Sequence, residues 1–131
     1  MVNRHGGAVV LWSGLALLIG LVMLTQPSAG QAPAFRVLVF SRTTAFRHTA
    51  SIAAGLQAIK DLGAGNNFAV DTTEDATTFT AANLARYRVV VFLSTTSYED
   101  RSKGPALLNT TQRAAFEQYI RAGGGYVGIH A

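Results

Sequence analysis

The chain has 131 residues, and its 11 lysines and arginines outnumber its 7 aspartates and glutamates, giving a formal net charge of +4. The basic residues are scattered and form no stripe with interleaved aromatic side chains, which argues against nucleic-acid binding. The sequence contains no cysteine, which excludes disulfides and a lipoprotein anchor on an acylated cysteine.

The N-terminal segment has the pattern of an export signal. Arg4 stands before an apolar run over residues 8–24, and small residues at 27–32 offer cutting sites for a signal peptidase. We therefore expect residues 1–30 to be a signal peptide, residues 31–34 a short linker, and the protein to be secreted or periplasmic. The run is close to the lower limit of about 17 residues for a membrane span, so an uncleaved N-terminal membrane anchor is the alternative.

The remainder of the chain alternates strand and helix patterns. Strands are predicted where β-branched and aromatic residues run together, and helices where apolar residues recur every three or four positions. The predicted elements are, in chain order, a strand at 35–41, a helix at 49–62, a strand at 68–72, a helical turn at 80–85, a strand at 89–94, a helix at 109–122 and a strand at 126–129. Strands and helices in alternation, joined by short loops, predict an α/β fold with a doubly wound parallel sheet.

Each of the two long helices has one apolar face, and we expect the first helix to pack on the sheet. The apolar positions are Ile52, Leu56, Ile59 and Leu62 in the first helix and Ala115, Phe116, Tyr119 and Ile120 in the second. Glycines and asparagines at 63–67 predict the end of the first helix, and Asn109 or Thr110 is a candidate N-cap for the second.

The last nine residues, GGGYVGIHA, contain the pattern G-x-G-x-x-G at Gly123, Gly125 and Gly128. In a dinucleotide-binding fold such glycines follow a strand and open a helix, because the helix N-terminus binds the pyrophosphate. Here they follow a predicted helix and precede a predicted strand. We therefore interpret Gly123 and Gly124 as the stop of a helix and not as a phosphate-binding loop.

Ligands of doubly wound sheets bind at the carboxyl ends of the strands, so the loops that follow the strands hold the candidate site. His48 and His130 each follow a strand and could act in acid-base catalysis or as two ligands of a divalent metal, the alternative being a capping or packing role. Arg42 and Arg47 could hold an anionic or polyhydroxyl group, the alternative being simple solvation. Three acidic residues are interpreted as turn and helix-start residues and not as a catalytic pair, namely Asp71, Glu74 and Asp75.

Several blocks of the sequence resemble the ThuA-like (trehalose utilisation) family, and they occur in the family's order across residues 35–131. The blocks are VLVFS, FRH followed by SI, DTTED, VVFLSTT and GGGYVGIHA. The resemblance implies a class I glutamine amidotransferase-like fold, which is a flavodoxin-like doubly wound sheet, and a role in sugar or trehalose catabolism, often after export. Domains of this family extend further, so we expect residues 35–131 to be a C-terminally truncated domain.

The same resemblance carries over His48 and His130 as the catalytic or metal-binding candidates. The candidate substrate-binding residues are Arg47, Ser94, Thr95 and Thr96. In the amidotransferase-like fold, the turn after the glycine-rich strand exposes a nucleophilic cysteine, but this sequence has Ile129 and His130 in that region. The resemblance therefore does not imply cysteine-dependent glutamine amidotransfer.

Two functional classes stay open from the sequence. The first is an exported enzyme that acts on a sugar or glycoside with His48 and His130 as its acid-base or metal-binding groups. The second is a non-catalytic carbohydrate-binding or accessory module, a reading suggested by the missing cysteine. A small carbohydrate is the expected partner in both classes, and a membrane would be involved only through the export signal or an uncleaved anchor.

Overall fold

The computed structural model describes residues 32–98, 100 and 102–131. The predicted signal peptide lies outside these residues. The elements within them are β1 (Phe35–Phe40), α1 (Thr49–Gly65), β2 (Phe68–Thr73), the short 3-10 helix η1 (Ala76–Thr78), α2 (Ala81–Leu84), β3 (Val89–Leu93), α3 (Thr110–Arg121) and β4 (Gly125–Ile129). No helix in this part of the chain is both long and apolar enough to cross a membrane.

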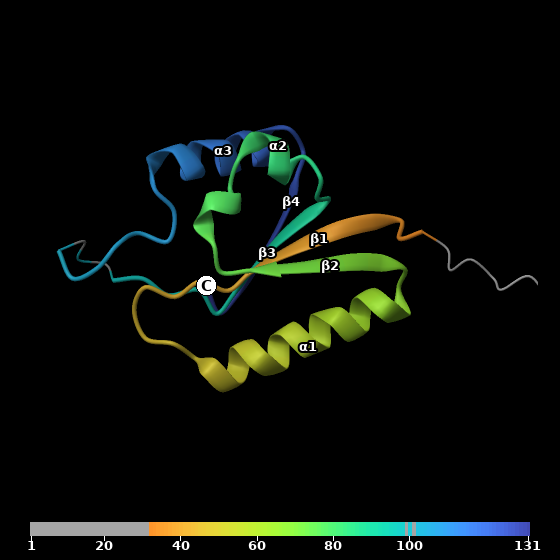
Figure 1. Ribbon diagram of the computed structural model, residues 1–131, viewed down its shortest axis with the longest axis horizontal. Helices are drawn as coiled ribbons and strands as arrows, with labels where there is room; N and C mark the ends of the chain where they lie inside the picture. The colour runs from red at the N-terminus through yellow and green to blue at the C-terminus, as the bar shows by residue number, and fades with distance from the viewer. Residues whose placement is uncertain (1–31, 99, 101) are drawn as a thin grey trace, which may run out of the picture.

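The four strands form one parallel sheet in the order β2-β1-β3-β4. α1 lies on one face of this sheet, and α2 and α3 lie on the other, so the molecule has three layers (Figure 1). This arrangement confirms the doubly wound α/β fold, and the strand order is that of a flavodoxin-like sheet. The strands run parallel because each connection returns the chain to the end of the sheet where the previous strand began.

Both faces of the sheet are covered, and the sequence of β1 shows why this is possible. Successive side chains of a strand point to opposite faces, so a strand that is covered on both sides needs an unbroken apolar run. Leu38 and Phe40 pack toward α2 and α3, whereas Val37 and Val39 pack toward α1. All four side chains are at most 4% exposed.

α1 ends later than predicted, at Gly65. Its buried positions run from Ile52 to Gly63, while Leu62 is 57% exposed, so the prediction that Leu62 packs on the sheet is wrong. A β-carbon on Gly63 would lie 2.7 Å from the carbonyl oxygen of Phe68, so this glycine lets the helix lie directly against β2. Glycine is a poor helix former, which is why the sequence indicated a helix stop at this position. In the structure, Gly63 lies within α1, where it allows close packing against β2.

α3 begins and ends as predicted. The Asn109 side chain accepts a hydrogen bond from the N–H of Gln112, and the Gln112 side chain accepts one from the N–H of Asn109, which makes a capping box. Gly123 follows the helix with φ of 92°, a left-handed conformation that glycine adopts at the least cost. On the apolar face of this helix, Tyr119 is buried, whereas Ile120 is 39% exposed.

The acidic residues around β2 have two different roles. Asp75 matches the prediction, because its carboxylate accepts a backbone hydrogen bond and caps η1. Asp71 does not match it, because it lies inside β2 and binds two side chains on the face covered by α2 and α3. The Arg36 guanidinium donates to it at 2.7 Å and the Tyr87 hydroxyl donates to it at 2.8 Å. Asp71 is therefore a structural ion-pair partner and not a turn residue.

Asp71 should make the free energy of unfolding depend on pH in the acidic range. Hydrogen bonds from Arg36 lower the pKa of the Asp71 carboxyl, and this effect outweighs the partial burial that raises it. A carboxyl with a lowered folded-state pKa stabilises the fold above its unfolded pKa of about 3.9, and this stabilisation is lost as the pH falls through the folded value. In Asp71→Asn, we expect the unfolding free energy at neutral pH to fall by about 1 kcal/mol.

Thermal unfolding of Asp71→Asn, followed by circular dichroism at a series of acidic and neutral pH values, checks this prediction. The variant should lose less stability than the wild-type protein on acidification, because it lacks the carboxyl that must be protonated. Asp61→Asn on the exposed side of α1 is the matched control and should follow the wild-type curve. Equal acid sensitivity in Asp71→Asn and wild type would contradict the assignment.

Candidate functional site

The carboxyl ends of β1, β3 and β4 meet at one edge of the sheet, and backbone hydrogen bonds tie their loops together. Thr43 and Thr96 form a parallel bridge, and the Thr44 N–H donates to the carbonyl oxygen of Thr96 at 2.8 Å. The Ser94 N–H donates to the carbonyl oxygen of Ile129 at 2.7 Å. Three loops that are distant in sequence are thus held in fixed positions relative to one another.

The two candidate histidines contact each other at this edge. His48 directly precedes α1 and His130 directly follows β4, and their Nε2 atoms lie 3.2 Å apart. The ring centroids are 4.6 Å apart and the ring planes make an angle of 79°. At this distance the two Nε2 atoms can share a hydrogen bond, and the tautomers of the rings decide which one is the donor. We call His48 and His130 the histidine pair.

Backbone strain is concentrated beside the histidine pair. Ser94 and His130 both have φ of 48°, in the left-handed region that residues with a β-carbon rarely adopt. They directly follow Leu93 and Ile129, which are register partners in β3 and β4. Each such residue costs on the order of 1–3 kcal/mol, a cost that glycine would avoid. Backbone strain of this kind is common at functional sites, which supports placing the candidate site here.

Hydroxyl groups follow β3 on the side of the sheet covered by α3. Thr95 is buried at 5% exposure, and Thr96 donates from its Oγ1 to the carbonyl oxygen of Phe46. A cavity of about 490 Å³ opens here, and His130 forms part of its wall. The other residues that line it are Phe92, Thr95, Thr96, Ser97, Leu107, Tyr126 and Ala131. The cavity thus combines hydroxyls, aromatic rings and one imidazole, which is a lining suited to a hydroxylated small molecule.

A second hollow lies on the other side of His130, between α1 and the sheet. It has a volume of about 550 Å³, and both members of the histidine pair and Ser94 border it at one end. Most of its remaining lining is apolar and comes from Gly55, Ala58, Ile59, Leu62, Leu93 and Ile129. The structure therefore brings together His48, His130 and Ser94 at one hollow, and His130, Thr95 and Thr96 at the other.

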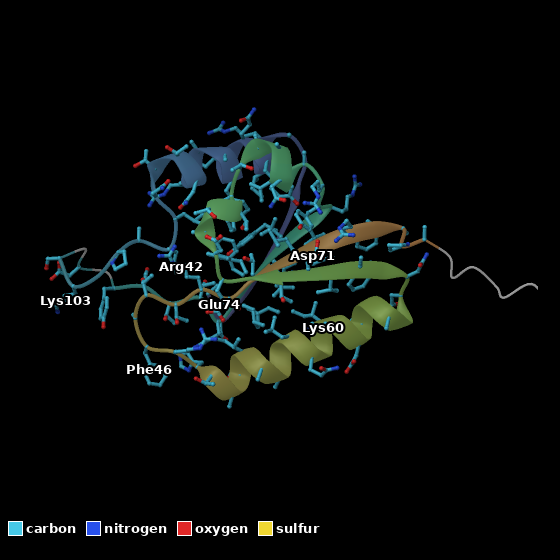
Figure 2. All side chains as sticks on the ribbon, viewed as in Figure 1. Arg42, Phe46, Lys60, Asp71, Glu74 and Lys103 are labelled. Atoms are coloured by element: carbon cyan, nitrogen blue, oxygen red, sulfur yellow. The ribbon has the colours of Figure 1, made fainter. Side chains whose placement is uncertain are left out.

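The candidate arginines do not join the histidine pair. Arg47 forms a bidentate ion pair with Glu74, with nitrogen–oxygen distances of 2.6 and 3.0 Å, and these hydrogen bonds raise the pKa of Arg47. This contact links the loop after β1 to the loop after β2 and so fixes the residue that precedes His48. Arg42 donates to the carbonyl oxygen of Leu107 at 3.4 Å. Figure 2 labels Arg42 and Glu74 on these loops.

Among the described residues, the histidine pair provides the candidate side chains for binding a metal. In residues 32–98, 100 and 102–131, no group of three or more His, Cys, Asp or Glu side chains is arranged to hold a metal ion. Two imidazoles supply half of a tetrahedral ligand set for an ion such as Zn²⁺. The remaining ligands would have to come from outside this set of side chains.

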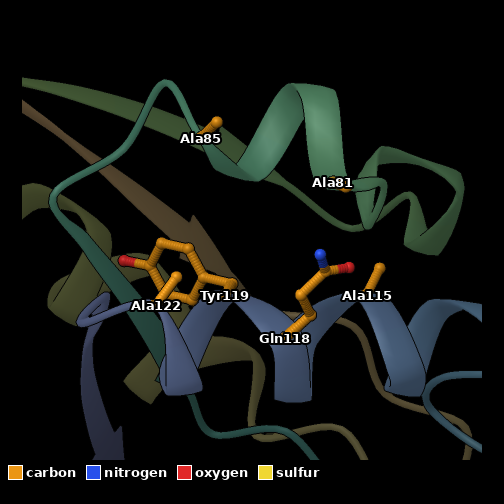
Figure 3. Close-up of a pocket in the computed structure, with 6 residues that line it drawn as sticks. All are labelled: Ala81, Ala85, Ala115, Gln118, Tyr119 and Ala122. Carbon is orange, nitrogen blue, oxygen red and sulfur yellow. The ribbon is translucent and has the colours of Figure 1, made fainter.

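Another cavity, of about 190 Å³, lies between α2 and α3 and is shown in Figure 3. Its wall is formed by Ala81, Ala85, Ala115, Gln118, Tyr119 and Ala122. Burial raises the pKa of the Tyr119 hydroxyl, which already donates to the carbonyl oxygen of Gly125. This cavity therefore offers packing space and no pair of reactive groups, so we do not assign the candidate site to it.

Sequence reasoning assigned no role to Phe46 and interpreted Glu74 only as a turn or helix-start residue, yet both contact candidate site residues. Phe46 packs against His48 with 4.8 Å between the ring centroids, and Glu74 binds Arg47. Phe46 belongs to the sequence block FRH and Glu74 to the block DTTED. Membership of these blocks was the available indication that the two residues belong to the site. The contact between Glu74 and Arg47 could not be predicted because it joins loops that follow different strands, and the contact between Phe46 and His48 depends on the conformation of a single loop.

Comparison with known proteins bears on the family of the chain. A family model described as trehalose utilisation, ThuA, matches residues 36–131. A crystal structure of a ThuA-like protein from Bacteroides uniformis matches with a TM-score of 0.58 and 28% identity, over 78% of this chain and 38% of that one. The chain thus spans well under half the length of this solved relative. A search of curated proteins found no match.

Proposed function

The chain belongs to the ThuA family of trehalose utilisation, and we propose that it is an exported protein that processes a sugar or glycoside at the histidine pair. The observation that carries this proposal is the 3.2 Å contact between the Nε2 atoms of His48 and His130 at the carboxyl edge of the sheet. Export is supported by the apolar run at residues 8–24. The N-terminal sequence of the mature protein tests it.

The histidine pair has the groups needed for proton transfer to and from a sugar. One neutral imidazole can accept the proton of a sugar hydroxyl, while a protonated ring can donate to a departing or carbonyl oxygen. Because His130 lines the hydroxyl-bearing cavity with Thr95 and Thr96, a sugar held by these threonines would lie next to the imidazole. The threonines are therefore proposed to orient the substrate and the histidines to move its protons.

The same two rings are our candidates for holding a divalent metal. Nitrogen ligands favour Zn²⁺ and similar ions, and a bound ion would polarise a sugar oxygen. Metal analysis of the purified wild-type protein and of its histidine variants distinguishes this use from metal-free proton transfer. A metal present in wild type and lost in both variants would assign the pair to metal binding.

Two substitutions test the function without breaking the fold. Asparagine tolerates the left-handed backbone of His130, and glutamine keeps a polar side chain at His48, so we choose His130→Asn and His48→Gln. Each should lower turnover of trehalose or an aryl glycoside by about 100-fold or more, because general acid-base catalysis contributes on that scale. Lys60→Ala on the exposed side of α1 is the control and should keep full activity.

The outcomes separate the two functional classes. Turnover that survives in both histidine variants would contradict the assignment of the pair. If the wild-type protein binds trehalose but converts neither trehalose nor a panel of glycosides, the chain is a carbohydrate-binding module and the enzymatic part of the proposal fails.

A further inference from the structure

Phe46 is an exposed aromatic residue beside the histidine pair. Its side chain is 71% exposed, against 38–57% for the other exposed large hydrophobic side chains of the described residues. Figure 2 shows it on the loop that leads into α1. A single exposed hydrophobic residue is common on protein surfaces and carries no meaning alone. What distinguishes Phe46 is its position beside His48 and Thr96.

The segment that carries Phe46 is fixed on both sides. Its carbonyl oxygen accepts a hydrogen bond from the Thr96 hydroxyl, and the backbone of Thr44 also binds Thr96. The next residue, Arg47, is held by its ion pair with Glu74. The exposed ring is therefore presented by a loop with several anchors, and little conformational freedom would be lost when a ligand contacts it.

The ring of Phe46 continues a row of rings that includes the histidine pair. Its centroid lies 4.8 Å from that of His48 at an interplanar angle of 75°, and His48 lies 4.6 Å from His130 at 79°. Because the ring is 71% exposed, this contact leaves much of its surface accessible to a ligand. An aromatic face carries negative potential, which attracts the slightly positive C–H groups on the apolar face of a pyranose ring.

We propose that Phe46 is a sugar-stacking residue of this site, which receives the apolar face of a pyranose whose hydroxyls reach the histidine pair. This inference rests on the proposed function and specifies its substrate class as a pyranose or pyranoside. An acyclic polyol has the same hydroxyl chemistry but no rigid apolar face. The site should therefore bind glucose or trehalose and discriminate against sorbitol.

Binding of trehalose to the full chain tests this role. Phe46→Ala should weaken binding by roughly 2- to 10-fold, the scale of an aromatic contact, and Phe46→Leu should weaken it similarly because it lacks a π face. Phe46→Trp should keep or improve affinity, and its indole fluorescence should change saturably with trehalose and not with sorbitol. Phe35→Ala is the matched control, since Phe35 is also an exposed phenylalanine but lies at the first residue of β1, away from the carboxyl edge of the sheet.

Because the Phe46 side chain is largely exposed, these variants should fold, which circular dichroism verifies. Unchanged trehalose affinity in Phe46→Ala, with turnover still lost in the histidine variants, would overturn the stacking role and leave the proposed function intact. Absence of trehalose and glucose binding by the wild-type chain would overturn both. Equal loss in Phe46→Ala and Phe35→Ala would also overturn the stacking role.

Discussion

In Gly124→Ala, the free energy of unfolding is expected to fall by about 3 kcal/mol, the upper end of the usual cost of overpacking a core. A β-carbon at this position would lie 2.2–2.4 Å from three atoms of the Tyr119 ring, far inside any real contact. The ring cannot easily move away. It is 8% exposed, stacks on Phe116 at 6.1 Å between centroids, and its hydroxyl binds the carbonyl oxygen of Gly125.

Gly65→Ala provides the matched control for Gly124→Ala. Gly65 is the last residue of α1, and a β-carbon there would meet no atom within 4 Å. Because alanine favours a helix over glycine by up to about 1 kcal/mol, this variant should be as stable as wild type or slightly more stable. Urea unfolding of the three proteins measures the difference. A loss below about 1 kcal/mol in Gly124→Ala would show that Tyr119 can repack.

Gly124 also illustrates which parts of the fold could be predicted from the sequence. The helix stop and the following strand were predictable, because the glycines follow an amphipathic helix and precede a β-rich segment. The contact that excludes a side chain at Gly124 could not be predicted. It depends on how closely the chain passes the Tyr119 ring after the helix has ended. Gly63 shows the reverse error, since local propensity predicted a helix end where packing against β2 keeps the helix going.

The candidate site was predictable in its location and not in its geometry. His48 and His130 each follow a strand, and parallel strands place their carboxyl ends at one edge of the sheet. Their direct contact depends on the strand order and on two loops, and it joins residues 82 positions apart. The left-handed backbone of Ser94 and His130 leaves no trace in the sequence, because neither residue type signals that conformation as glycine would.

Phe40→Ala should be the most damaging substitution in the core, with an expected loss of about 3–5 kcal/mol in unfolding free energy. Phe40 is 0% exposed and lies at the carboxyl end of β1. Its ring contacts Phe79 at 4.7 Å and Phe92 at 5.2 Å between centroids, in tilted and edge-on arrangements that add to the hydrophobic effect. Truncation would leave a cavity between β1, β3 and η1 that rigid neighbours cannot fill.

Phe35→Ala is the matched control for Phe40→Ala, because it makes the same chemical change at the other end of the same strand. Phe35 is 38% exposed and stacks only on Phe68, so its loss should cost about 1 kcal/mol. Since a domain of this size has about 5–15 kcal/mol of stability, Phe40→Ala should leave a folded but marginal protein. Urea unfolding at low temperature measures both variants. Equal losses at the two positions would contradict a core centred on Phe40, and with it the rigid support that β1 gives to the loop carrying His48.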